Sequence, residues 1–63
     1  MNNKVRELRI KKGLSQEELA SLANLSRFTI IKVENDRDVN LTKNAMVAIA
    51  NALGDKVSNI FFF

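Results

Sequence analysis

The side chains best suited to binding chemistry lie in the segment RFTIIK, at residues 27–32. If this segment is helical, a rotation of about 100° per residue brings two cations and two large apolar groups to one face: Arg27, Phe28, Ile31 and Lys32. Ile30 and Val33 fall on the opposite face, at the spacing of a core stripe. Large apolar groups are unusual on a solvated face and typical of a surface that contacts a partner. This face is therefore predicted to bind a partner.

Residues that catalyse reactions or bind metals are scarce. The chain has no His and no Cys, so it lacks the usual general base at neutral pH and the usual zinc ligands. The acidic residues fall where helix caps and surface charges are expected, and no nucleophile has a plausible base beside it. The run NDRD at residues 35–38 lacks the glycine and the closing glutamate of a calcium loop. We therefore expect neither an enzyme nor a cofactor.

Two short helices joined by a tight turn must position the mixed face. Ser15 is a suitable N-cap, and Glu18 completes a capping box at the start of the first helix. Asn24 suits the turn because it tolerates a positive φ better than other residues apart from glycine. Ser26 then caps the second helix, which we expect to end near Glu34.

Three further helices are predicted around this pair. The first spans residues 3–12, and another runs from the N-cap Thr42 to Gly54 and is apolar around most of its circumference. Asp55 is positioned to cap a last helix over residues 56–61. The chain has no Pro and two Gly, which favours short connections between helices. We therefore expect an all-α, compact bundle of five short helices.

Size and charge limit the organisation of the chain. With 63 residues it has room for one domain over residues 1–63, and a chain of this size buries only about 60% of its unfolded surface. The net charge of +3 suits an anionic partner, and five of the ten Lys and Arg residues lie among the first dozen residues. No signal peptide or transmembrane run is apparent. We therefore expect a cytoplasmic protein.

Residues 16–35, QEELASLANLSRFTIIKVEN, resemble the helix-turn-helix of the phage repressor/Cro family, also called the Xre family. The matching positions are Gln16, Ala20, Leu25, Ile30, Val33, Glu34 and Asn35. The flanks are similar as well: LRIKKGLSQEELA overlaps the start of the motif, and a helix ending in ALG follows it. The resemblance extends from about Val5 to Phe61. Asn24 and Asp36 depart from it, at positions where the family commonly has Gly.

The resemblance implies a lambda-repressor-like fold with the helix-turn-helix at the second and third helices. It also implies a sequence-specific regulator, usually a repressor, that binds double-stranded DNA. Proteins of this kind bind as homodimers to two half-sites about 34 Å apart, which gives a pseudo-palindromic operator. Repression and activation both stay open, and no small-molecule ligand or membrane partner is expected.

The resemblance assigns base contacts to Arg27, Phe28 and Lys32. Arginine can donate two hydrogen bonds to guanine O6 and N7, lysine can reach the same acceptors, and phenylalanine can pack on a thymine methyl group. The family often has a polar residue at the position of Phe28. An alternative is that Phe28 is a partly buried core residue.

Contacts to the DNA backbone follow from the same resemblance. They are expected from Gln16, Arg9, Thr29, Asn35 and Arg37. Arg9 is also expected to pair with Glu34 and to brace the first helix against the end of the recognition helix, for which its planar guanidinium is suited. The alternatives are an unpaired surface Arg9, an ordinary exposed Gln16, and a local ion pair between Arg37 and a neighbouring aspartate.

The end of the chain suggests self-association. Three consecutive aromatic side chains cannot all face one small core, and an exposed apolar segment favours an interface. We therefore expect a dimer interface formed by Ile60, Phe61, Phe62 and Phe63. The alternative is a frayed end. An alternative function on the same scaffold is a protein-interaction module or an antitoxin-like partner that binds a protein through Phe28 and Ile31.

Overall fold

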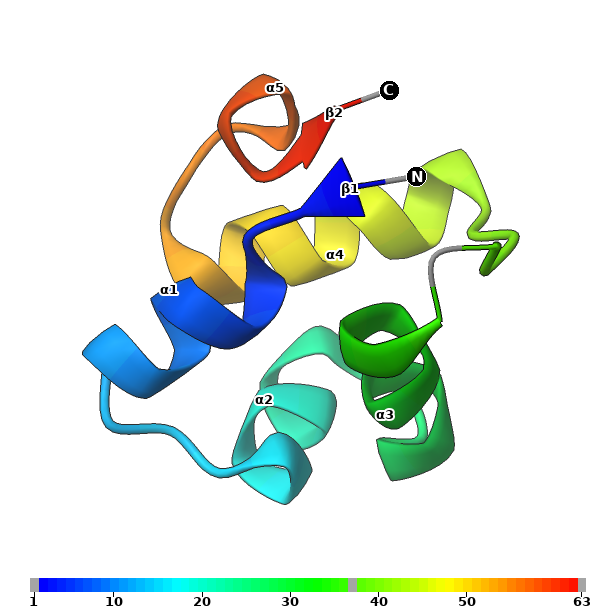
Figure 1. Ribbon diagram of the computed structural model, residues 1–63. Coiled ribbons are helices and arrows are strands. Elements are labelled where there is room, and N and C mark those ends of the chain that lie inside the picture. The colour runs from blue at the N-terminus through cyan, green and yellow to red at the C-terminus, as the bar shows by residue number, and fades with distance from the viewer. Residues whose placement is uncertain (1, 37, 63) are drawn as a thin grey trace.

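The computed structural model describes residues 2–36 and 38–62, and five short helices form most of it (Figure 1). The helices are α1 (Val5–Lys11), α2 (Gln16–Ala23), α3 (Arg27–Asn35), α4 (Lys43–Leu53) and α5 (Val57–Ile60). Two short strands, β1 (Asn2–Asn3) and β2 (Phe61–Phe62), pair beside them. The five predicted helices are confirmed, whereas the sequence did not predict the strands.

The helices enclose one core. α2 packs against both α3 and α4, and α1 contacts the same two helices. The largest fully buried side chains come from all five helices: Leu19, Ile30, Ile49, Ile60, Val5 and Val33. In Figure 1, α2 and α3 lie together at the bottom of the molecule, while α5 and the strands lie at the top. No helix among the described residues is both long and apolar enough to cross a membrane.

Side-chain caps determine where α2, α3 and α4 begin. The hydroxyl of Ser15 accepts a hydrogen bond from the backbone N–H of Glu18 at 3.0 Å, and the Glu18 carboxylate accepts from the backbone N–H of Ser15 at 2.9 Å. The hydroxyls of Ser26 and Thr42 accept from the backbone N–H three residues later, at 3.2 and 3.1 Å. Each bond satisfies an N–H that has no partner within its helix. The three predicted N-caps are confirmed.

The capping box makes stability depend on pH. Hydrogen bonds from Ser15, first from its backbone N–H and then from its hydroxyl, hold the pKa of Glu18 below its ordinary value of 4.5. A lowered pKa in the folded state stabilises the fold above the unfolded pKa, and this contribution is lost as the pH falls through the folded pKa. We expect Glu18→Gln to lower the Tm at neutral pH and to flatten its decline between about pH 5 and pH 3.

Thermal denaturation followed by circular dichroism measures this effect. The matched control is Glu17→Gln, which makes the same charge change one residue away without removing the capping carboxylate. The same flattening in both variants would show that general charge, and not the capping box, causes the pH dependence.

The turn between α2 and α3 depends on Asn24. It has φ = 55°, and no other residue apart from glycine has a positive φ in the described part of the chain. We expect Asn24→Ala to lower the free energy of unfolding by about 1 kcal/mol, because alanine lacks the short polar side chain through which asparagine tolerates this conformation. Asn24→Gly should not lower it. Urea denaturation of the two variants measures the difference. Equal stabilities would contradict a conformational role for Asn24.

The strands β1 and β2 form an antiparallel ladder in which Asn2 pairs with Phe62 and Asn3 with Phe61. The backbone N–H of Lys4 also donates to the carbonyl oxygen of Ile60 at 2.8 Å. Because the ladder takes up residues at both ends, α1 begins later than the predicted residue 3 and α5 ends before the predicted residue 61. The end of the chain is therefore paired rather than frayed up to Phe62.

The ladder also corrects the predicted dimer interface. Ile60 and Phe61 are 0% and 5% exposed, and they belong to the core. Their assignment to the interface is wrong, because a side chain enclosed by its own chain has no surface left for a partner. Phe62 is 39% exposed, and Phe63 lies outside the described residues.

The start of α5 differs from the prediction as well. Its N-cap is Lys56, without a side-chain cap. The predicted cap, Asp55, lies one residue earlier and accepts hydrogen bonds from the backbone N–H of Lys56 at 2.7 Å and from Asn59 Nδ2 at 2.8 Å. Asp55 therefore still fixes the first turn of this helix.

Candidate nucleic-acid interface

The helix α3 has two distinct faces. Ile30 and Val33 are 0% and 2% exposed and pack into the core, whereas Phe28 is 76% exposed. Arg27 and Lys32 are exposed as well, and Ile31 is half-buried. The alternative that Phe28 is a core residue is wrong, since its ring faces away from the core. The outer face therefore combines an aromatic ring with two cations.

The first turn of α3 is held by its cap. The Ser26 hydroxyl accepts a hydrogen bond from the backbone N–H of Thr29. The hydroxyls of Ser26 and Thr29 also lie 3.0 Å apart and share a hydrogen bond. Thr29 is half-buried, so its hydroxyl serves the cap while part of the side chain stays accessible. Arg27 and Phe28 therefore project from a turn whose backbone is fixed.

The last turn of α3 is held by an ion pair with α1. Arg9 Nε donates to Glu34 Oε2 at 2.7 Å, and Arg9 Nη2 donates to Glu34 Oε1 at 3.1 Å. Arg9 Nη1 also donates to the carbonyl oxygen of Leu14 at 2.8 Å. The side chains of Glu34 and Arg9 are 1% and 12% exposed, and the hydrogen bonds to Glu34 raise the pKa of Arg9. The ion pair is therefore largely shielded from water.

Gln16 joins this ion pair from the first turn of α2. Its Nε2 donates to Glu34 Oε1 at 3.3 Å. One carboxylate thus connects α1, α2 and α3. The contact between Gln16 and Glu34 was not predicted from the sequence, because the two residues lie on different helices, 18 positions apart.

The other residues assigned to the DNA backbone have different surroundings. Asn35 is exposed at the end of α3, and Arg37 lies outside the described residues. Arg9 has three of its five N–H groups directed at acceptors of its own chain. The geometry therefore favours bracing over phosphate binding as the main role of Arg9.

Asn3 makes a second polar contact to the end of α3. Its Nδ2 donates to the carbonyl oxygen of Val33 at 2.9 Å, and its Oδ1 accepts from the backbone N–H of Val5 at 3.0 Å. A shallow hollow of about 370 Å³ lies beside this contact. It is lined by Asn2, Asn3, Arg6, Val33, Glu34, Asn35 and Asp36. No local sequence pattern indicates this contact, which spans 30 positions.

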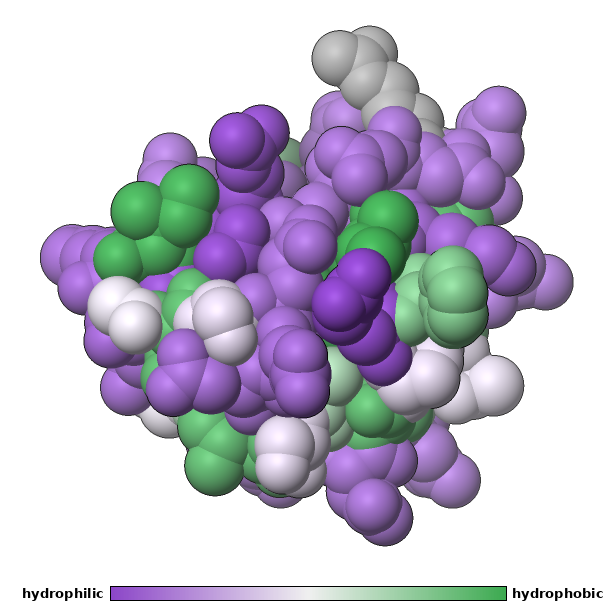
Figure 2. All heavy atoms as spheres, turned by 90° about the horizontal axis from the view of Figure 1, so that it is seen from below, coloured by the Kyte–Doolittle hydropathy of each residue, from purple (hydrophilic) through white to green (hydrophobic). Residues whose placement is uncertain are grey.

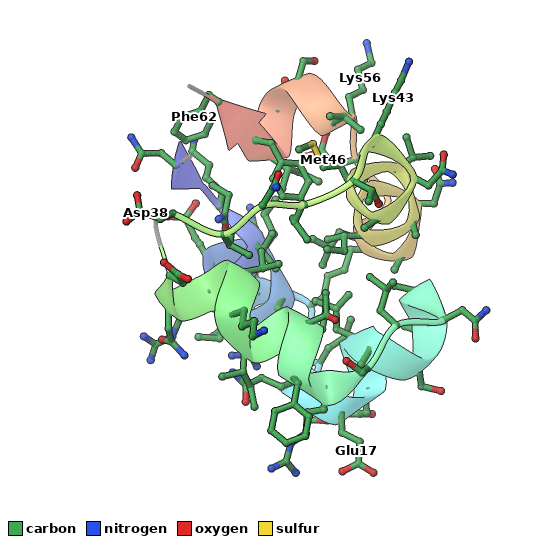
Figure 3. The ribbon with its side chains drawn as sticks, turned by 90° about the vertical axis from the view of Figure 1, so that its right-hand side faces the viewer. Glu17, Asp38, Lys43, Met46, Lys56 and Phe62 are labelled. Atoms are coloured by element: carbon green, nitrogen blue, oxygen red, sulfur yellow. The ribbon has the colours of Figure 1, made fainter. Side chains whose placement is uncertain are left out.

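The surface seen from below, the side on which α2 and α3 lie, is mostly hydrophilic with separate apolar side chains (Figure 2). Figure 3 shows Glu17 of α2 at this end, with Lys43, Lys56 and Phe62 toward the opposite end. A face with scattered apolar groups among charged ones suits the major groove, which offers methyl groups beside hydrogen-bonding base edges. Within residues 2–36 and 38–62, no cluster of acidic residues could hold a metal ion.

Comparisons with known proteins agree with this geometry. Residues 5–56 match the helix-turn-helix family HTH_3. The chain is 37% identical over 60 residues to the immunity repressor protein of Bacillus phage phi105, and it spans 41% of that repressor's length. It is 32% identical over 63 residues to an uncharacterised HTH-type transcriptional regulator of Archaeoglobus fulgidus, of which it covers 89%.

Two solved structures are similar as well. The restriction-modification controller protein C.AhdI from Aeromonas hydrophila has a TM-score of 0.85 and 38% identity, with 92% of this chain and 86% of that chain covered. The hypothetical transcription factor NHTF from Neisseria has a TM-score of 0.82 and 36% identity, with 89% of this chain and 62% of that chain covered. The fold is therefore that of lambda-repressor-like regulators.

Proposed function

This chain belongs to the Xre-like helix-turn-helix family HTH_3, a family of DNA-binding transcriptional regulators rather than enzymes, and we propose that it represses transcription from a specific operator. The observation that carries the proposal is the outer face of α3, where Phe28 is 76% exposed beside exposed Arg27 and Lys32. A helix of nine residues is about 13 Å long, which suits insertion into a major groove.

We propose that Arg27, Phe28 and Lys32 read base edges. Arg27 donates to guanine O6 and N7, Phe28 packs on a thymine methyl group, and Lys32 donates to a second guanine. Gln16, Thr29 and Asn35 contact phosphates, which fixes the position of α3 without specifying sequence. Phosphate contacts release counterions, so affinity falls steeply as salt increases.

We further propose that residues 1–63 act as one domain and that two copies form a homodimer on a pseudo-palindromic operator. Phe62 supports this proposal, since it is 39% exposed on β2 and lies away from the end of the molecule that carries Glu17 (Figure 3). An interface there leaves both recognition helices free. Two half-sites then lie about 34 Å apart.

Selection of bound sequences from random duplex DNA at near-physiological salt tests the proposal. Enrichment of a motif with two-fold symmetry is the expected result, and its half-site spacing defines the dimer. Analytical ultracentrifugation with and without the enriched duplex gives the stoichiometry. Weak, salt-sensitive binding without any enriched motif would exclude a specific operator, and a monomer on a single half-site would exclude the dimer.

A protein partner is the second candidate. Phe28 is the most exposed large apolar side chain among the described residues, and an aromatic ring of this kind is a common anchor in protein interfaces. Binding of a protein that requires Phe28, ignores salt and does not compete with DNA would favour this candidate.

A further inference from the structure

The side chain of Asn3 serves two helices at once. The carbonyl oxygen of Val33 lies in the last turn of α3, where carbonyl groups have no partner within the helix. The N–H of Val5 lies in the first turn of α1, where N–H groups have none. Asn3 Nδ2 donates to the Val33 carbonyl oxygen at 2.9 Å, and Asn3 Oδ1 accepts from the Val5 N–H at 3.0 Å. An amide suits both tasks, because it carries a donor and an acceptor on one planar group.

The contact to Val33 matters because the surroundings of this end of α3 are polar next to the buried Val33 side chain. The hollow beside it is lined mainly by polar residues, with Asn2, Asn3 and Arg6 on one side and residues 33–36 on the other. Besides the core packing of Val33, polar contacts hold the last turn. Those in the described residues are the Arg9–Glu34 pair, the bond from Gln16 to Glu34 and the bond from Asn3 to Val33.

Asn3 is itself held by the ladder between β1 and β2. It pairs with Phe61, which is 5% exposed in the core, and the next residue, Lys4, donates its backbone N–H to Ile60 at 2.8 Å. Figure 1 shows β1 beside β2 at the top of the molecule and α3 below. The Asn3 side chain therefore connects a fixed strand to the last turn of α3, the helix proposed to contact DNA.

We propose that Asn3 is a positioning residue for DNA recognition, which holds the last turn of α3 at the orientation in which Arg27, Phe28 and Lys32 meet base edges together. This inference rests on the proposed function of α3. Recognition side chains discriminate between bases only if their helix is held within a fraction of an ångström, which requires supporting contacts of this kind. Sequence selectivity therefore depends on a residue that touches no base.

Three variants separate the positioning role of Asn3 from the effects of added charge and of its bond to the Val5 N–H. Asn3→Ser keeps a neutral acceptor near the N–H of Val5 but is too short to reach the carbonyl of Val33. Asn3→Asp keeps the acceptor at full length and places an oxygen against that carbonyl. Asn2→Asp is the matched control, because it adds the same charge on an exposed residue that makes no side-chain hydrogen bond among the described residues.

The readout is the ratio of Kd for a scrambled duplex to Kd for the duplex enriched in the selection, with equal length and composition. A change of charge alters phosphate attraction to both duplexes alike, so this ratio reports on positioning. We expect Asn3→Ser and Asn3→Asp to lower the ratio about fivefold or more, by the loss of one hydrogen bond to a buried carbonyl. Asn2→Asp should change it less than about twofold.

Amide hydrogen exchange gives a second readout without DNA. Both Asn3 variants should exchange faster than Asn2→Asp at residues 33–36, because a looser last turn opens more often. An unchanged ratio or an unchanged exchange rate in the Asn3 variants would overturn the positioning role of Asn3 and leave the proposed function intact. If the unmodified protein enriches no duplex, the proposed function fails first, and the inference fails with it.

Discussion

Replacing Arg9 by alanine is expected to lower the free energy of unfolding by about 3 kcal/mol, because the Glu34 carboxylate would lose its cationic partner while it stays buried. Glu34 is 1% exposed and accepts two bonds from Arg9, at 2.7 and 3.1 Å. Only the longer bond from Gln16, at 3.3 Å, would remain. In a chain of this size the Tm should fall by about 20 °C.

The same substitution should weaken operator binding, since the ion pair holds the last turn of α3 against α1. Arg6→Ala is the matched control: it removes an exposed cation from the same helix, one that forms no ion pair within the described residues. It should change the Tm little, as surface charges contribute at most about 1 kcal/mol. Similar losses of Tm in the two variants would contradict a bracing role for Arg9.

Two further variants keep the test decisive if Arg9→Ala does not fold. Arg9→Lys keeps the charge but loses the bidentate hydrogen bonding to Glu34, so its Tm should lie between those of the unmodified protein and Arg9→Ala. Changing both partners to methionine should lower the free energy of unfolding less than Arg9→Ala does, because no unpaired shielded charge then remains. A double variant less stable than Arg9→Ala would rule out the buried charge as the cause.

Arg27→Ala is expected to weaken binding to the best operator by about 1–3 kcal/mol and to relax the preference at one base pair. The side chain is exposed on the first turn of α3, whose backbone is fixed by the Ser26 cap, so the loss comes from the missing contact and not from a displaced helix. Binding is measured by fluorescence anisotropy against the enriched duplex and its single-base variants.

Asn35→Ala provides the contrast, because Asn35 is exposed and loss of a proposed phosphate contact should weaken all duplexes about equally. Lys43→Ala is the charge control: Lys43 begins α4 and lies toward the end of the molecule opposite Glu17 (Figure 3). It should lower affinity slightly and uniformly. If Arg27→Ala also weakened all duplexes equally, Arg27 would be a phosphate contact and its assignment as a base reader would be wrong.

Local signals in the sequence predicted the helix-turn-helix well. Ser15, Ser26 and Thr42 cap helices as expected, because a cap depends on residues three positions apart. Asn24 adopts the predicted positive φ, because few other residues tolerate that conformation. The division of α3 into a buried and an exposed face follows from its periodicity alone. The family resemblance rested on the same local positions, and the match to HTH_3 confirms it.

Only the tertiary structure decided which of the terminal residues are buried. The spacing of Ile60 and Phe61 is compatible with either a core or an interface, and the choice depends on β1, whose residues lie nearly the whole chain away. The contacts of Glu34 with Gln16 and of Val33 with Asn3 have the same origin, with separations of 18 and 30 positions. Such contacts leave no periodic trace in the sequence, since they depend on how complete helices and strands pack against one another. The sequence therefore determined α3 and its exposed face, whereas packing determined the contacts that hold this helix in place.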